Sequence, residues 1–183
     1  RFKCDWSSDV CSSDLQPFTS KFDYVMRGQA KFTAQEERGL NLFIQPQKGN
    51  CAQCHSVDVA SRDPQKSLFT DFSFRALGLP RSTRIPKNSD ATFFDLGLCE
   101  RMPVAGVKLP APATRPVVTD PASCGQFKTP TLRNITISAP YMHNGLFDTL
   151  REAVAFYATR DTDPGRWFPA GHKFNDLPAR FHA

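Results

Sequence analysis

Positions 51–55 read Cys-Ala-Gln-Cys-His, a Cys-x-x-Cys-His run whose residue types suit one kind of chemistry. Two thiols three positions apart can each form a thioether with one vinyl group of a porphyrin, and the imidazole that follows can bind the iron from one side. The run therefore predicts one covalently bound haem c. Cys51 and Cys54 are the expected points of attachment, and His55 is the expected proximal iron ligand.

Two other uses of paired cysteines fit the sequence less well. A zinc site needs a second close pair of cysteines or histidines, whereas Cys99 and Cys124 have no close partner. A thioredoxin-like redox pair needs no histidine after it, and no strand-then-helix pattern surrounds this one. Cys99 and Cys124 could form a disulfide, which would suit the oxidising compartment where haem c is attached, but the sequence does not decide this.

The first fifteen residues stand apart from the rest of the chain. Ser-Ser-Asp at 7–9 recurs at 12–14, and the run around it looks like a translated sequencing adapter. We interpret residues 1–15 as a non-native, adapter-derived segment, with a native linker rich in serine and aspartate as the alternative. Residues 16–183 are then expected to form one c-type cytochrome domain.

Charge and hydropathy exclude several classes of function. The 183-residue chain carries a formal net charge of +5, but its basic residues are scattered among acidic ones and form no stripe that would bind nucleic acid. No apolar run approaches the roughly 20 residues of a membrane-spanning helix. The positive balance instead favours association with an acidic protein partner.

Two capping boxes mark helices that would position the candidate residues. Thr33 with Glu36 predicts a helix from there to about Phe43, and Pro46 and Gly49 end it just before the haem motif.

The second capping box, at 149–152, predicts a helix through about position 158. In it Leu150, Val154 and Tyr157 fall at i, i+4 and i+7, so they share a face and Tyr157 is expected to point inward. Prolines are frequent between 81 and 128 and predict a long irregular loop. The expected fold is mainly α, a cytochrome c-like haem domain with long irregular loops.

Several blocks between about positions 21 and 177 resemble those of a known family, the bacterial di-haem cytochrome c peroxidases and their relative MauG. The most specific are Leu-Arg-Asn at 132–134 and Ala-Pro-Tyr-Met-His-Asn-Gly at 139–145; others are Gly39-Leu-Asn-Leu-Phe, Lys48-Gly-Asn-Cys-Ala-Gln-Cys-His, Phe69-Thr-Asp-Phe and Leu150-Arg-Glu-Ala-Val-Ala-Phe-Tyr.

The resemblance implies two cytochrome c-like domains, of which this chain matches the second. The first domain, which carries the peroxide-binding haem in the family, and the closing helix are missing, so the chain is interpreted as a fragment truncated at both ends. The implied function is electron transfer in a periplasmic oxidoreductase that reduces hydrogen peroxide with electrons from a small cytochrome c or cupredoxin. The fragment alone is expected to be inactive. The alternatives are a MauG-like protein-modifying oxidase and a mono-haem electron carrier without catalytic activity.

The resemblance also bears on the distal iron ligand. Met142 is one candidate, because a His/Met pair is common in electron-transfer cytochromes. In the family register, however, the peroxidases supply their methionine at the place of Tyr157, and MauG has a tyrosine there. Tyr157 is therefore the favoured distal ligand and Met142 the alternative.

Other roles are implied by position in the family blocks. His143 could assist proton or electron traffic, or could be a packing histidine. Ser138 and Pro140 match positions whose backbone carbonyls bind an interdomain calcium ion, so calcium is a possible second cofactor. Arg133 could pair with a haem propionate or brace the turn at 131–134.

Overall fold

The computed structural model describes residues 18–90, 92–98 and 121–168, and these form two compact units. The first unit contains the described residues up to Ser73 together with Thr129–Ile137. The second contains Phe74–Lys128 and the chain from Ser138 onward, again where it is described. The adapter-like segment 1–15 and Cys99 lie outside the described residues, so the expectations that concern them stay predictions.

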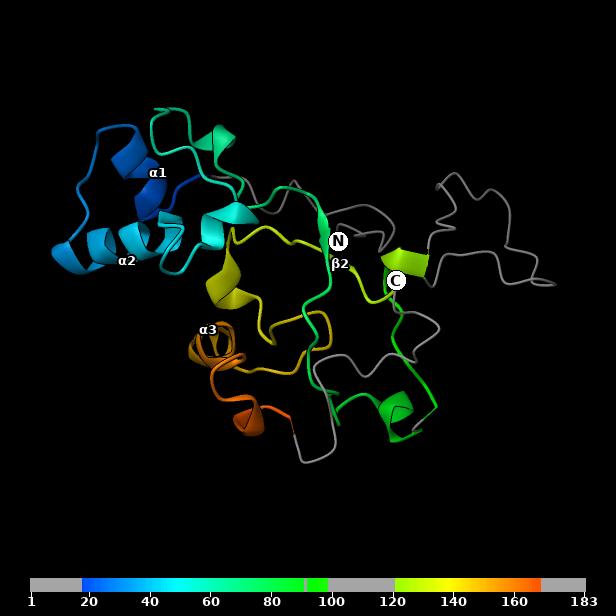
Figure 1. Ribbon diagram of the computed structural model, residues 1–183. Helices are drawn as coiled ribbons and strands as arrows, with labels where there is room; N and C mark the ends of the chain where they lie inside the picture. Colours follow the sequence, from blue (N-terminus) through cyan, green and yellow to red (C-terminus); the bar gives the residue numbers. More distant parts are fainter. Residues whose placement is uncertain (1–17, 91, 99–120, 169–183) are drawn as a thin grey trace, which may run out of the picture. The chain divides into compact units, whose positions relative to one another are not determined.

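Helices are the main regular elements of the described chain. The α-helices are α1 (Lys21–Met26), α2 (Ala34–Ile44) and α3 (Leu150–Thr159), as Figure 1 shows. Short 3-10 helices are η1 (Cys51–Gln53), η2 (Pro64–Lys66), η3 (Pro86–Ser89), η5 (Pro121–Ser123), η6 (Ile135–Ile137) and η7 (Pro164–Arg166). Strands β1 (Phe74–Arg75) and β2 (Phe127–Lys128) pair antiparallel, with Phe74 opposite Lys128. The described residues are thus helix-rich with few strands, and irregular loops connect the elements.

Reciprocal capping hydrogen bonds start α2 and α3 where the sequence predicted them. The Thr33 amide donates to Glu36 Oε2 over 2.7 Å, and the Glu36 amide donates to Thr33 Oγ1 over 3.3 Å. Thr149 and Glu152 make the same pair of bonds at α3. A hydrogen bond from Lys21, together with the one from the Thr33 backbone, lowers the pKa of Glu36 to about 2. Both predicted helices are confirmed, each ending within a residue of its expected end.

Loss of the α3 cap gives a measurable stability change. We expect Thr149→Ala to lower the free energy of unfolding by about 1 kcal/mol, because one amide at the helix start loses its acceptor. Thr162→Ala is the matched control, since the exposed Thr162 hydroxyl makes only a 3.4 Å contact with the Thr159 carbonyl. Urea unfolding followed by circular dichroism measures both variants, and equal losses in the two would contradict the capping role.

The core of the second unit is aromatic and lies against one side of α3. Phe156 is fully buried, with its ring centroid 5.6 Å from that of Phe147 and 5.5 Å from that of Trp167. Val154 and Tyr157 are 65% and 52% exposed. The expectation that Tyr157 points inward with its neighbours is therefore wrong for this unit. The reason is that apolar side chains occupy several sides of α3, and contacts with the rings of Phe147 and Trp167, outside the helix, select the side of Phe156.

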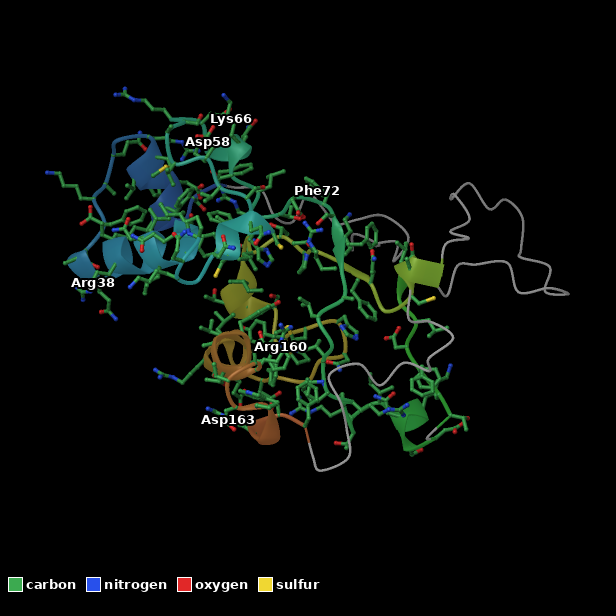
Figure 2. The ribbon with its side chains drawn as sticks, in the orientation of Figure 1. Arg38, Asp58, Lys66, Phe72, Arg160 and Asp163 are labelled. Carbon is green, nitrogen blue, oxygen red and sulfur yellow. The ribbon has the colours of Figure 1, made fainter. Side chains whose placement is uncertain are left out.

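The C-terminal end of α3 is tied to an earlier loop of the same unit. Arg160, which Figure 2 labels, caps the helix and donates from Nη1 to the Leu77 carbonyl over 2.8 Å. Its guanidinium also pairs with Asp161. Asp163, also labelled in Figure 2, follows before η7. These bonds fix the direction in which the chain leaves α3.

A buried ion pair crosses the first unit. Arg133 Nη1 lies 2.6 Å from Asp23 Oδ1, and the two side chains are 7% and 0% exposed. Burial raises the pKa of Asp23, but hydrogen bonds from Ser20 and Arg133 and the charge of Arg133 outweigh it, so the net shift is downward. The pair links α1 to the segment before η6, which lies more than a hundred residues later in the chain.

The lowered pKa of Asp23 makes the stability of this unit sensitive to acid. Because the folded pKa lies below the unfolded value, the contribution is fully present above the unfolded pKa and is lost as the pH falls through the folded one. We expect the urea midpoint to fall in that acidic range and to fall less steeply in Asp23→Asn, which has no charge to lose. Urea titrations at a series of pH values check this, and parallel curves for the two proteins would contradict it.

Candidate functional site

The Cys-x-x-Cys-His run forms a tight turn directly after α2. The Cys51 carbonyl accepts hydrogen bonds from the amides of Cys54 (3.2 Å) and His55 (2.8 Å), which closes η1. Gly49 donates its amide to the carbonyl of Leu42 over 3.0 Å, and a Cβ at this glycine would lie 2.6 Å from that same oxygen. This close contact between Gly49 and the Leu42 carbonyl leaves no room for a side chain, so glycine is required between α2 and the motif.

Both motif thiols are free and lie on this turn. Cys51 is exposed and Cys54 is half-buried. Partial burial of its sulfur raises the pKa of the Cys51 thiol, and the neighbouring Cys54 adds to the shift. Within the described ranges no group of three or more His, Cys, Asp or Glu side chains is placed to hold a metal ion.

The His55 ring is oriented by a backbone carbonyl. Nδ1 lies 2.9 Å from the oxygen of Phe69. A carbonyl can only accept, so Nδ1 carries the hydrogen and the lone pair of the neutral ring is on Nε2. This is the arrangement by which proteins orient a histidine that binds a metal through its other nitrogen. The donor set of two thiols and one oriented imidazole fits a covalently attached haem.

The candidate distal ligands belong to the second unit. Tyr157 lies on α3 with its ring edge against Phe156, at 6.0 Å between centroids, and half of its side chain is exposed. Met142 is half-buried in the turn before α3, with a positive φ of 70°, and its carbonyl accepts from the Gly145 amide over 3.2 Å. The structure thus places the proximal and distal candidates on different units.

His143 is packed against an aromatic ring. Its ring stacks on Phe127, with centroids 3.5 Å apart and planes inclined by 8°. Burial lowers the pKa of His143, although the Asp95 carboxylate, 3.9 Å from Nε2, acts in the opposite direction. The net shift favours the neutral form of the ring. This contact supports the packing role that the sequence left open.

The remaining candidates lie in both units. Ser138 and Pro140 lie in an exposed stretch of the second unit, immediately before the buried Tyr141. Cys124 is buried and disulfide-bonded, whereas Cys99 lies outside the described residues. The Arg133 side chain donates to Asp23 and to the carbonyls of Pro64 and Ser67 inside the first unit. These bonds tie the segment at 131–134 to two earlier parts of that unit, and a role toward a haem propionate stays a prediction.

Sequence reasoning missed the partner of His55. Nothing in the residue type of Phe69 marks its carbonyl as an acceptor, and fourteen positions separate it from the histidine.

The chain is similar to several known haem proteins over most of its length. It is 39% identical over 151 residues to the methylamine utilization protein MauG of Paracoccus denitrificans, a match that covers 80% of this chain and 34% of MauG. It is 31% identical over 139 residues to the cytochrome c551 peroxidase of Nitrosomonas europaea, covering 74% and 30% of the two chains. No family model matches the sequence.

A solved structure extends the likeness to the fold. The diheme peroxidase BthA of Burkholderia thailandensis E264 superposes with a TM-score of 0.77 at 43% identity, covering 92% of this chain and 38% of BthA. This chain spans about a third of the length of the relatives that it matches. Among the described residues, no helix has the length and apolar character to cross a bilayer. By sequence and by fold, the chain belongs to the family of MauG and the diheme cytochrome c peroxidases, and it corresponds to a part of the length of these proteins.

Proposed function

We propose that this chain is the electron-transfer haem domain of a periplasmic di-haem oxidoreductase that reduces hydrogen peroxide. The observation that carries the proposal is the orientation of His55. Its Nδ1 bonds the Phe69 carbonyl, and the turn to which His55 belongs also presents two free thiols. Membership of the peroxidase and MauG family supports a peroxidase-type haem oxidoreductase. The proposal includes the assignment of this chain as the second domain of a longer enzyme.

The residues of this chain divide the work of holding a haem. Cys51 and Cys54 would anchor it covalently, and His55 would ligate its iron through Nε2. When bound, the haem supplies reversible one-electron exchange at the iron. The bond from His55 Nδ1 to the Phe69 carbonyl increases the electron donation of the imidazole and so favours the oxidised state.

Tyr157 is the distal ligand in this proposal. Its side chain is half exposed on α3. A phenolate is a hard anionic donor and stabilises ferric and higher oxidation states more than a thioether does. Met142 is the alternative, and it would give the higher reduction potential of a His/Met site.

Electrons would come from a small redox protein, a cytochrome c or a cupredoxin. The net charge of +5 supports an acidic donor surface, because complementary charge speeds the encounter of two proteins. The 39% identity to MauG supports a second candidate, in which a protein side chain is the electron source. Calcium bound by the carbonyls of Ser138 and Pro140 is a further part of the proposal.

The division of labour between two haems predicts little peroxidase turnover by this chain alone. With His55 and a second side chain as its ligands, the iron would have no position left for peroxide. The haem-loaded chain should therefore accept electrons from a reduced cytochrome c but should not consume peroxide at enzymatic rates. Stopped-flow spectroscopy measures the first reaction, and steady-state oxidation of reduced cytochrome c by peroxide measures the second. Rapid turnover would show that the iron has a free coordination position, and it would contradict the proposed role.

A further inference from the structure

A short segment, residues 67–70, lies beside the haem motif in the first unit. His55 Nδ1 lies 2.9 Å from the Phe69 carbonyl oxygen, and Ser56 Oγ donates to the Thr70 carbonyl over 2.7 Å. Two consecutive carbonyls of the segment are therefore taken by side chains at the end of the motif.

The other two carbonyls of the segment accept hydrogen bonds from residues that come later in the sequence. Thr131 Oγ1 donates to the Leu68 carbonyl over 2.5 Å. Arg133 donates to the Ser67 carbonyl from Nη2 over 2.7 Å and from Nε over 3.0 Å. Four successive carbonyls are thus held by four side chains, and the segment connects the histidine to the turn at 131–133.

Arg133 holds this segment through two of its four side-chain hydrogen bonds. Besides its two bonds to the Ser67 carbonyl, it donates to the Pro64 carbonyl over 3.0 Å and to Asp23 over 2.6 Å. Its guanidinium carbon lies 5.2 Å from the centroid of the Phe69 ring. Arg133 therefore contacts Phe69, whose carbonyl faces His55, and also fixes the backbone two residues before it.

The backbone at Phe69 needs such support. Its φ is 54°, in the left-handed region that a bulky side chain rarely adopts. A residue in that region stays there only where its surroundings hold it. The conformation matters for the site, because it helps set where the Phe69 carbonyl points and hence how well it accepts from His55 Nδ1.

We propose that Arg133, fixed by Asp23, is a positioning residue for the proximal histidine and tunes the reduction potential of the iron through the Phe69 carbonyl. The inference rests on the proposed ligation of haem by His55. A strong bond from Nδ1 to the carbonyl makes the imidazole a better donor and lowers the potential. Loosening the segment weakens that bond and raises the potential.

The test uses the haem-loaded full chain. Arg133→Lys keeps a positive charge beside Asp23. A lysine ammonium, however, cannot donate to two carbonyls and the carboxylate at once, as the planar guanidinium does. We expect a higher reduction potential in a redox titration and shifted His55 ring-proton resonances in the NMR spectrum of the ferric protein. Arg84→Lys is the control, since Arg84 forms a bidentate pair with Asp148 at an exposed place in the second unit. It should change neither readout.

Two further variants keep the outcome decisive. His55→Ala should abolish the low-spin spectrum; an unchanged spectrum would refute His55 ligation and with it the proposed function. If ligation holds and folded Arg133→Lys keeps the potential and resonances of the unmodified chain, the positioning role is wrong. Should Arg133→Lys not fold, Thr131→Val tests the same segment, with a smaller rise in potential expected and no change counting against the role.

Discussion

Replacing Cys51 and Cys54 together by serine is expected to abolish covalent haem attachment. The reason is that serine keeps nearly the size of each side chain but removes the thiolate that adds to a vinyl group. The unmodified chain, produced with a haem-attachment system, should keep its haem absorbance after denaturation in acid and organic solvent, and its intact mass should include one haem. The double variant should lose all of its absorbance under these conditions.

The single variants act as controls for one another. Cys51→Ser and Cys54→Ser each leave one thiol, so each should keep one thioether and show the altered haem spectrum of a porphyrin with one free vinyl group. Because the two thiols are on one turn and both are unpaired, neither substitution breaks another bond in the described structure apart from a weak 3.5 Å contact between Cys51 Sγ and the Gly49 carbonyl. Complete extraction of haem from the unmodified chain would contradict the assignment.

Tyr157→Phe is expected to convert the ferric iron completely from low spin to high spin. Phenylalanine keeps the ring that packs against Phe156 and removes only the donor oxygen, so lost ligation is separated from lost packing. The opened position should then bind added cyanide. Optical and electron paramagnetic resonance spectra of the ferric protein measure both changes.

Met142→Leu is the matched variant for this test. Its thioether is the alternative donor, and leucine is close to it in volume, so the turn before α3 should be kept. With Tyr157 as ligand, Met142→Leu leaves the spectrum unchanged, and the unmodified protein lacks the far-red charge-transfer band of sulfur ligation. Conversion to high spin by Met142→Leu, and not by Tyr157→Phe, would make this a His/Met site.

The sequence predicted those parts of the fold that depend on local interactions. The boxes at Thr33 and Thr149 each place donor and acceptor within four residues, and both helices begin as expected. The haem motif is equally local, since its attachment chemistry requires only the spacing within 51–55. The box that starts α1, Ser20 with Asp23, has the same pattern with aspartate in the last place, and we did not predict it.

Interactions between distant segments were not predictable in this way. The acceptor of His55 is a main-chain oxygen, which every residue possesses, so its selection depends on a backbone conformation that Arg133 and Thr131 hold from over sixty residues away. The buried side of α3 is likewise set by Phe147 and Trp167, which lie outside the helix. Because α3 has apolar residues on more than one side, the spacing of these residues could not predict which side is buried.

The packing of Trp167 makes the second unit optically visible. Its indole Nε1 donates to Thr159 Oγ1 over 2.9 Å, and its ring meets Phe147 and Phe156 edge-on. The chain has one other tryptophan, Trp6, so a Trp6→Phe protein would emit from a single indole. Fluorescence would then report unfolding of the second unit around Trp167, while the haem absorbance would report the proposed ligation of the iron by His55 and Tyr157. One sample would show whether the second unit unfolds together with the loss of this ligation.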